Sequence, residues 1–143
     1  MIFSAQQIFS DDQAITVSED STNVIDLGAA GIPYGAVAAL NQDIGKGAKI
    51  PVLVQVTEAF NTLTSLTIKI STGATTALGT EIASQTIALA DLLVGKQINI
   101  DVLPLNVKER YLGIEYVVTG TPPTLGKITA GISMGNQTNV TGA

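Results

Sequence analysis

The sequence predicts an all-β protein of about eight short antiparallel strands, arranged as a sandwich or a barrel. Apolar and polar residues alternate with a period of two along much of the 143-residue chain, as in strands that cover a core with one face. Clusters of Gly, Thr, Asn and Pro separate these runs. The runs lack the i, i+3, i+4 apolar spacing of an amphipathic helix. Many short strands joined by turns are typical of sandwiches and barrels.

Five segments show the alternation most clearly. In residues 50–57, Val52, Val54 and Val56 share one face. Four later segments place three or four apolar side chains on one face in the same way: 66–71, 97–102, 111–118 and 127–133. Three weaker segments complete the predicted set of strands: 14–17, 22–27 and 82–89. Residues 88–93 predict one helical turn that ends at Gly95.

The rest of the chain is assigned to turns and to the two ends. Residues rich in Gly, Thr and Pro predict turns at 45–47, 71–73 and 119–123. We interpret residues 1–13 as an extended N-terminal arm and residues 14–135 as a single sandwich domain. Residues 136–143 are small and polar, which predicts a flexible C-terminal tail.

The composition excludes several classes of function. The chain has no cysteine and no histidine, so it has no disulfide framework, no Ser-His-Asp triad and no zinc site of the usual kind. Its formal net charge of −5, with only 7 basic residues, lacks the electrostatic footprint of a nucleic-acid-binding protein. No segment has the roughly 18 consecutive apolar residues of a membrane span. We therefore expect no nucleic-acid partner and no membrane insertion.

The chain is also unusually poor in charge. Only 13% of its residues are charged, against about 25% in an ordinary soluble domain. Much of the surface must therefore consist of Thr, Ser, Asn, Gln, Gly and Ala. Such a surface suits a subunit that is covered in an assembly, whereas a free monomer would tend to stick to its neighbours.

Three groups of residues suggest ligand chemistry, and a simpler interpretation is favoured for each. Residues 45–47, Gly-Lys-Gly, lack the Walker spacing and precede a strand, so a turn is favoured over a phosphate loop. Asp101 and Glu115, on different strands, are interpreted as unrelated surface acids rather than an acid–base pair. Acidic side chains near the N-terminus offer oxygen ligands for calcium but lack EF-hand spacing, which favours solvated turn acids: Asp11, Asp12, Glu19 and Asp20. We assign no catalytic, cofactor-binding or metal-binding residue.

The aromatic and charged residues are the candidates for contact with a partner protein. The chain has three Phe and three Tyr, for which core and interface roles are favoured. Residues 108–110, Lys-Glu-Arg, form its one dense charge group. This group is either a solvated turn or a salt-bridging contact to a neighbouring subunit, in which arginine suits bidentate pairing with a carboxylate. The candidate interface residues are Phe3, Phe9, Tyr34, Lys108 and Arg110.

Five segments, in their order and spacing, resemble a known family. They are STNVIDLG at 21–28, VQVTEAF at 54–60, IALADLLVG at 87–95, RYLGIEYVVTGT at 110–121 and GKITAGI at 126–132. Together they are similar to the capsid cement, or decoration, proteins of podovirus-like tailed phages of the Bordetella-phage type. The similarity covers residues 14–133, and its motifs are structural.

The resemblance implies a jelly-roll β-sandwich that forms homotrimers. It implies a virion structural protein on the outside of an icosahedral head, where each trimer clamps neighbouring major capsid proteins. It implies no catalysis and no cofactor. We expect the N-terminal arm to cross onto a neighbouring cement subunit or the shell. Residues 31–47 are longer and richer in Ala than the resemblance leads us to expect, so the loop that meets the shell is expected to differ.

Two other functions remain open. The first is a carbohydrate- or receptor-binding β-sandwich module, against which the absence of tryptophan counts, because such modules usually present aromatic platforms. The second is an enzyme with two acids in one cleft, which the sequence does not require. A mass measurement in solution helps to separate the first from a cement protein, since a stable trimer favours the latter.

Overall fold

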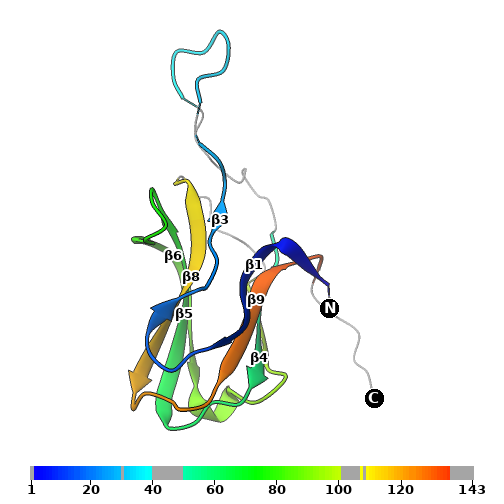
Figure 1. Cartoon of the computed structure of the whole chain (residues 1–143), viewed down its shortest axis with the longest axis vertical. Helices are drawn as coiled ribbons and strands as arrows, with labels where there is room; N and C mark the ends of the chain where they lie inside the picture. The colour runs from blue at the N-terminus through cyan, green and yellow to red at the C-terminus, as the bar shows by residue number, and fades with distance from the viewer. Residues whose placement is uncertain (1, 30, 40–49, 101–106, 108, 136–143) are drawn as a thin grey trace.

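The computed structural model describes residues 2–29, 31–39, 50–100, 107 and 109–135. Two antiparallel sheets pack against each other as a sandwich (Figure 1). One sheet has the order β1-β9-β4-β7: β1 (Phe3–Ala14), β9 (Lys127–Ser133), β4 (Val52–Glu58) and β7 (Gln97–Ile100). The other has the order β2-β8-β5-β6: β2 (Glu19–Asp20), β8 (Tyr111–Gly120), β5 (Leu63–Gly73) and β6 (Thr80–Ala88). A further short strand, β3 (Ile25–Asp26), also pairs with β8.

The strand order is that of a jelly roll. Because β2 and β3 both pair with β8, they form one interrupted edge strand. Counted in this way, the described chain has eight strands, with the order first-eighth-third-sixth in one sheet and second-seventh-fourth-fifth in the other. The all-β class, the antiparallel sandwich and the approximate strand number are therefore confirmed.

Helical structure is minimal. Within the described residues the one helical element is the 3-10 turn η1 (Leu89–Asp91), which lies inside the turn predicted for 88–93. No helix in this part of the chain is long and apolar enough to cross a membrane.

The core lies between the two sheets and is built from the faces that the alternation predicts. In β5, Leu66, Ile68 and Ile70 are fully buried, and Tyr116 of β8 is fully buried beside them in the same cluster. The Ser10 hydroxyl donates to the side-chain oxygen of Gln13 at 2.7 Å. Since its single proton is used there, Ser10 accepts from the Tyr116 hydroxyl at 2.8 Å. The phenol therefore enters the core without an unsatisfied donor.

The N-terminal segment is a strand of the sandwich, not the predicted arm. β1 pairs with β9 along its length, and Phe9 is fully buried in the core. Phe9 is therefore not available as a surface contact, which corrects its place among the interface residues. The register of β1 against β9 shifts three times, between Phe3 and Ile8, between Ile8 and Ser10, and between Ser10 and Gln13. These bulges interrupt the period of two by which a strand is found in a sequence.

The connections divide between two ends of the sandwich. The β6–β7 and β8–β9 connections lie at the end where β4 finishes, because Gln97 and Lys127 pair with Gln55 and Glu58. We call this the far end. Residues 31–39, which lie between β3 and β4, extend well beyond the other end of the sandwich, which we call the loop end (Figure 1). The predicted turn at 45–47, Asp101 and the predicted tail at 136–143 lie outside the described residues.

Candidate partner-binding surface

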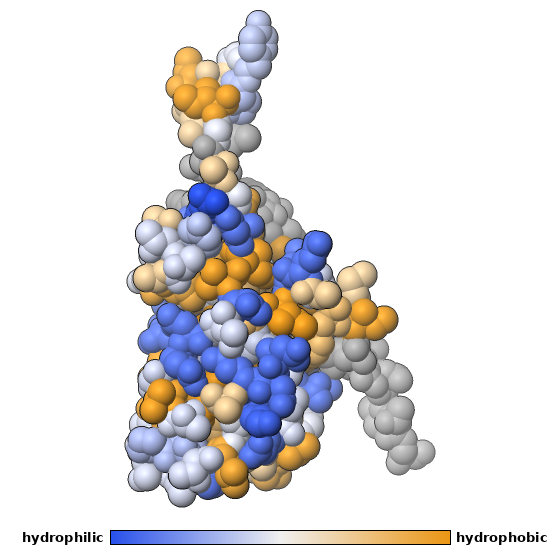
Figure 2. Space-filling view, in the orientation of Figure 1, coloured by the Kyte–Doolittle hydropathy of each residue, from blue (hydrophilic) through white to orange (hydrophobic). Residues whose placement is uncertain are grey.

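Residues 31–39, here called the projecting loop, form an apolar tip beyond the loop end (Figure 1). Every residue of the loop is exposed. The side chains of Tyr34 and Val37 are as open as in an extended chain, with relative exposures of 108% and 103%, and Ile32 is 66% exposed. Figure 2 shows the apolar groups gathered at the tip, away from the body. The loop contains no charged side chain, so water covers an uncharged and largely apolar surface.

A tight turn gives the projecting loop its shape. The Ala36 N–H donates to the Pro33 carbonyl oxygen at 3.0 Å, which closes a four-residue turn. Its third residue, Gly35, has a φ of +83°, the conformation that a type II turn requires and that glycine adopts without strain. Tyr34 occupies the second position and stands at the apex of the turn. The local sequence thus places the largest side chain of the loop at the apex of the turn, where it is fully exposed.

The root of the loop is fixed to β8 by a group of contacts that we call the root clamp. Arg110 donates to both carboxylate oxygens of Asp26, from Nε at 2.8 Å and from Nη2 at 2.7 Å. The guanidinium carbon lies 5.1 Å from the centre of the Tyr111 ring. The Leu27 N–H donates to the Arg110 carbonyl oxygen at 2.8 Å, and the Gly28 N–H donates to Asp26 at 2.8 Å. A bidentate pair, a cation–π contact and two backbone donors therefore hold the same short segment.

The contacts of the root clamp keep the Asp26 carboxylate ionised at an unusually low pH. Hydrogen bonds from Arg110 and then from Gly28 lower the pKa of Asp26 from its ordinary 3.8 to about 2. Because the folded pKa is the lower one, the contribution of the pair to stability is complete above pH 3.8 and is lost as the pH falls towards 2. We expect the NMR shift of the Asp26 carboxyl carbon to titrate near pH 2, and at a clearly higher pH in Arg110→Gln. Identical titrations in both proteins would show that the arginine is not the cause.

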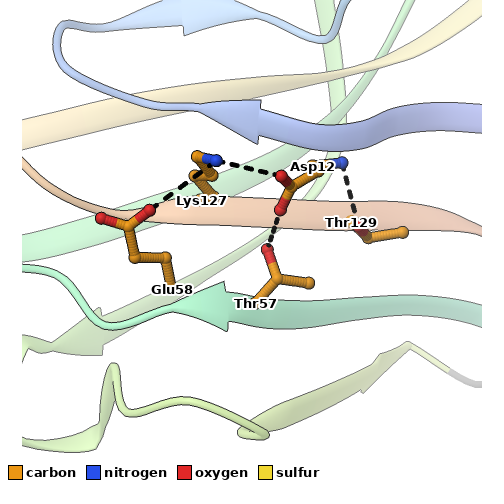
Figure 3. A network of polar contacts seen from close by, with 5 residues as sticks. All are labelled: Asp12, Thr57, Glu58, Lys127 and Thr129. Atoms are coloured by element: carbon orange, nitrogen blue, oxygen red, sulfur yellow. Dashed lines mark hydrogen bonds and ion pairs between the residues drawn. The ribbon is translucent and has the colours of Figure 1, made fainter.

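A second polar network lies near the far end and joins β1, β4 and β9 (Figure 3). Lys127 Nζ lies 3.1 Å from Asp12 Oδ2 and 3.8 Å from Glu58 Oε2. The Thr57 hydroxyl donates to Asp12 Oδ1 at 2.7 Å, and the Asp12 N–H donates to Thr129 Oγ1 at 3.0 Å. The bonds from Thr57 and Lys127 lower the pKa of Asp12. The network fixes the bulged end of β1, where Asp12 has a φ of +49°, and its role is structural.

Two acidic residues of the five-stranded sheet share one lysine. Lys69 lies 3.6 Å from Glu115 and 3.8 Å from Glu81 on the five-stranded sheet. Asp20 pairs in register with Glu115, and partial burial together with that carboxylate raises the pKa of Asp20. Glu115 thus contacts a lysine and faces Asp20 across the strand pair. Over the ranges that the structure describes, no three acidic side chains are grouped so as to hold a metal ion.

A shallow groove of about 420 Å³ runs between the edges of β6 and β7. The buried side chains of Ile87 and Ile98 lie on its lining, and its other lining residues are mostly polar: Gln85, Thr86, Ala88, Asp91, Lys96, Gln97 and Asn99. The side-chain amides of Gln85, Gln97 and Asn99 make no hydrogen bond within the described part of the chain. The groove therefore offers free donors and acceptors around an apolar patch, which suits a small polar ligand.

Comparison with protein-family models assigns the chain to a family. The model of the Bbp16 family matches residues 9–132. This range includes all the described strands except the first residues of β1 and the last residue of β9. The chain belongs to the Bbp16 family. Bbp16 is a family of Bordetella phage proteins, so the predicted relationship to phage proteins is confirmed at that level. No curated protein matches the sequence. The projecting loop and the root clamp both lie inside the region that the Bbp16 model covers.

The structure places the predicted interface residues of this Bbp16-family chain in different settings. Tyr34 is fully exposed at the tip of the projecting loop. Phe3 is half-buried, and its ring lies against Gly131 on the four-stranded sheet. Arg110 pairs with Asp26 of its own chain, so its carboxylate partner is internal. Lys108 lies outside the described residues.

Three residues of this surface are not among those predicted from the sequence. Ile32 and Val37 lie in an uncharged stretch that glycine and proline interrupt. This combination is the sequence signal that could have indicated an exposed apolar loop. Asp26 had no such signal, because it lies 84 residues before its partner Arg110. Pairing over that separation depends on β3 and β8 being neighbours in the sheet.

Proposed function

We propose that this protein is a virion structural protein, a capsid cement or decoration protein. It binds the outside of an icosahedral phage head and stabilises contacts between major capsid proteins. The observation that carries the proposal is a jelly roll of a phage protein family whose projecting loop leaves uncharged apolar side chains uncovered. Exposed apolar groups gathered at one place mark a site of protein association. The low charge of the whole chain supports a subunit that works inside an assembly.

The proposed function has a simple thermodynamic basis. A protein that binds the assembled shell and not the loose capsid subunits shifts the equilibrium towards the shell by mass action. We propose a homotrimer, which engages several capsid subunits at once. Weak single contacts then combine into strong attachment, because each further contact forms at a high effective concentration.

The test uses shells assembled from the major capsid protein of the same phage, without the cement protein. We expect the purified chain to sediment with these shells and to raise the temperature at which they come apart. Unassembled capsid subunits are the matched control and should bind far less. Failure to sediment with shells at micromolar concentration would contradict the proposal. Light scattering of the free protein tests the trimer, whose mass is three times 14.7 kDa.

A carbohydrate-binding function is the second candidate, and the groove between β6 and β7 favours it. Free amides around an apolar patch match the hydroxyl groups and the apolar face of a sugar ring. If this function holds, titration with oligosaccharides of the host surface shifts the NMR signals of the Gln97 and Asn99 side-chain amides. Absence of any shift at millimolar sugar would exclude the groove as a saccharide site.

A further inference from the structure

We infer that the projecting loop is the element that enters the shell, by inserting Tyr34 and Val37 into an apolar, uncharged recess between or within capsid subunits. This inference rests on the proposed function and adds to it the contact element and the chemistry of its counterpart. The sandwich body then stays outside the shell, with its loop end facing inwards. The argument has three steps, which concern the chemistry of the tip, its order before binding and the choice of occupant.

The chemistry of the tip specifies an apolar counterpart. The three large side chains of the loop are between 66% and 108% exposed, and residues 27–41 carry no charge. Burying such side chains removes apolar surface from water, which is favourable in proportion to the area. A polar or charged recess would lose its own hydration and gain few hydrogen bonds in return, since the Tyr34 hydroxyl is the one polar side-chain group of the loop. The matching surface is therefore apolar, and its attraction for the loop is insensitive to salt.

The loop is ordered before it binds. The Pro33–Ala36 hydrogen bond and Gly35 fix the turn at its tip. The root clamp fixes its base through the two bonds between Arg110 and Asp26. A segment that is already held in its bound shape loses less conformational entropy on association, so more of the burial energy appears as affinity.

The shell fits as the occupant better than a second copy of the chain. The groove that the structure describes on this chain is edged by amides and by the charged Asp91 and Lys96. Such a groove does not match an uncharged apolar tip. The loop also points away from the body, so it extends towards a surface that lies beyond the sandwich (Figure 1).

The experiment compares two matched double variants of the full chain. Tyr34→Ser with Val37→Ser removes the apolar tip. Val94→Ser with Leu125→Ser makes the same kind of change at the far end, where these side chains are 66% and 53% exposed. Binding to cement-free shells is measured by sedimentation at low and at high salt. We expect the tip variant to bind about tenfold more weakly or worse, and the far-end variant to stay within about twofold of the unmodified protein.

Each outcome bears on the inference. Unmodified protein is expected to keep its affinity within about threefold between roughly 0.05 and 0.5 M salt, and a much larger loss would mean a charged contact. Full binding by the tip variant would overturn the inference while leaving the cement function in place. No binding by the unmodified protein would overturn both. A tip variant that changes mass in light scattering would assign the loop to contacts between copies instead. Thermal melting of both variants checks that the sandwich is intact.

Discussion

Replacing Gly126 with alanine is expected to lower the free energy of unfolding by about 3–5 kcal/mol, one of the largest effects of any single methyl group in this protein. A Cβ at this position would lie 2.3 Å from Cδ1 and 2.5 Å from Cε1 of the Phe60 ring. Phe60 is only 7% exposed and belongs to the core, so the ring has little room to move. Gly126 also has a φ of +133°, a conformation that costs other residues backbone strain.

A second glycine separates the two causes. Gly135 has a φ of +152°, but a Cβ there would meet no atom within 4 Å. Gly135→Ala therefore introduces strain without a clash, and we expect it to cost about 1–2 kcal/mol. Urea denaturation of both variants measures the difference. Equal losses would mean that Phe60 moves aside freely and that the packing argument is wrong.

The second large effect is expected in alkaline solution and comes from Tyr116. Burial raises the pKa of the Tyr116 phenol far above its usual range, against a smaller opposite effect of its hydrogen bond to Ser10. The unfolded chain ionises this phenol near pH 10, whereas the folded chain keeps it neutral. The contribution to stability is therefore complete below pH 10 and is lost at about 1.4 kcal/mol per pH unit above it, up to the folded pKa.

Tyr116→Phe isolates this group from other groups that titrate at high pH. At neutral pH the variant lacks the 2.8 Å bond to Ser10 and is expected to be about 1 kcal/mol less stable. Above pH 10 the variant should lose less stability than the unmodified protein, so that the two curves approach and then cross. Tyr34→Phe, at the exposed tip, controls for the loss of a hydroxyl. Parallel curves for Tyr116→Phe and the unmodified protein would refute the argument.

The alternation of apolar and polar residues located the strands that cover the core on one face. β4, β5, β8 and β9 fall on the predicted segments because their inward positions hold Val, Ile, Leu, Ala or, in β8, Tyr116 at every second residue. β1 was not predicted as a strand because three register shifts interrupt its alternation of apolar and polar residues. β3 lies inside the weakly indicated segment 22–27, whereas the two residues of β2 are too few for any period to appear. β6 was only weakly indicated, since an edge strand exposes residues on both faces.

The candidate surface could be predicted only in part, for a different reason. Apolar residues in a sequence are normally assigned to the core, yet Ile32 and Val37 are on the outside of the molecule. Tyr34 was among the predicted interface residues because core and interface roles are favoured for the few aromatic residues of the chain. The partners of Arg110 and of Lys127 lie 84 and 115 residues away and follow from the sheet order, which no local pattern contains. The family resemblance implied a jelly roll but assigned no strand order.

The irregular strand edges bear on how this protein avoids aggregation. An open, regular edge strand can pair with the same edge of another molecule and begin aggregation. Here β1 is bulged three times, β2 and β3 are two-residue fragments, and β7 spans Gln97–Ile100. Within the described residues, these edges offer little continuous backbone to a second chain, which compensates for a surface with few charges. β6 has a register shift of its own between Glu81 and Ala83, so its regular stretch from Ala83 to Ala88 is the longest edge without such protection, and unwanted polymerisation of subunits would start there.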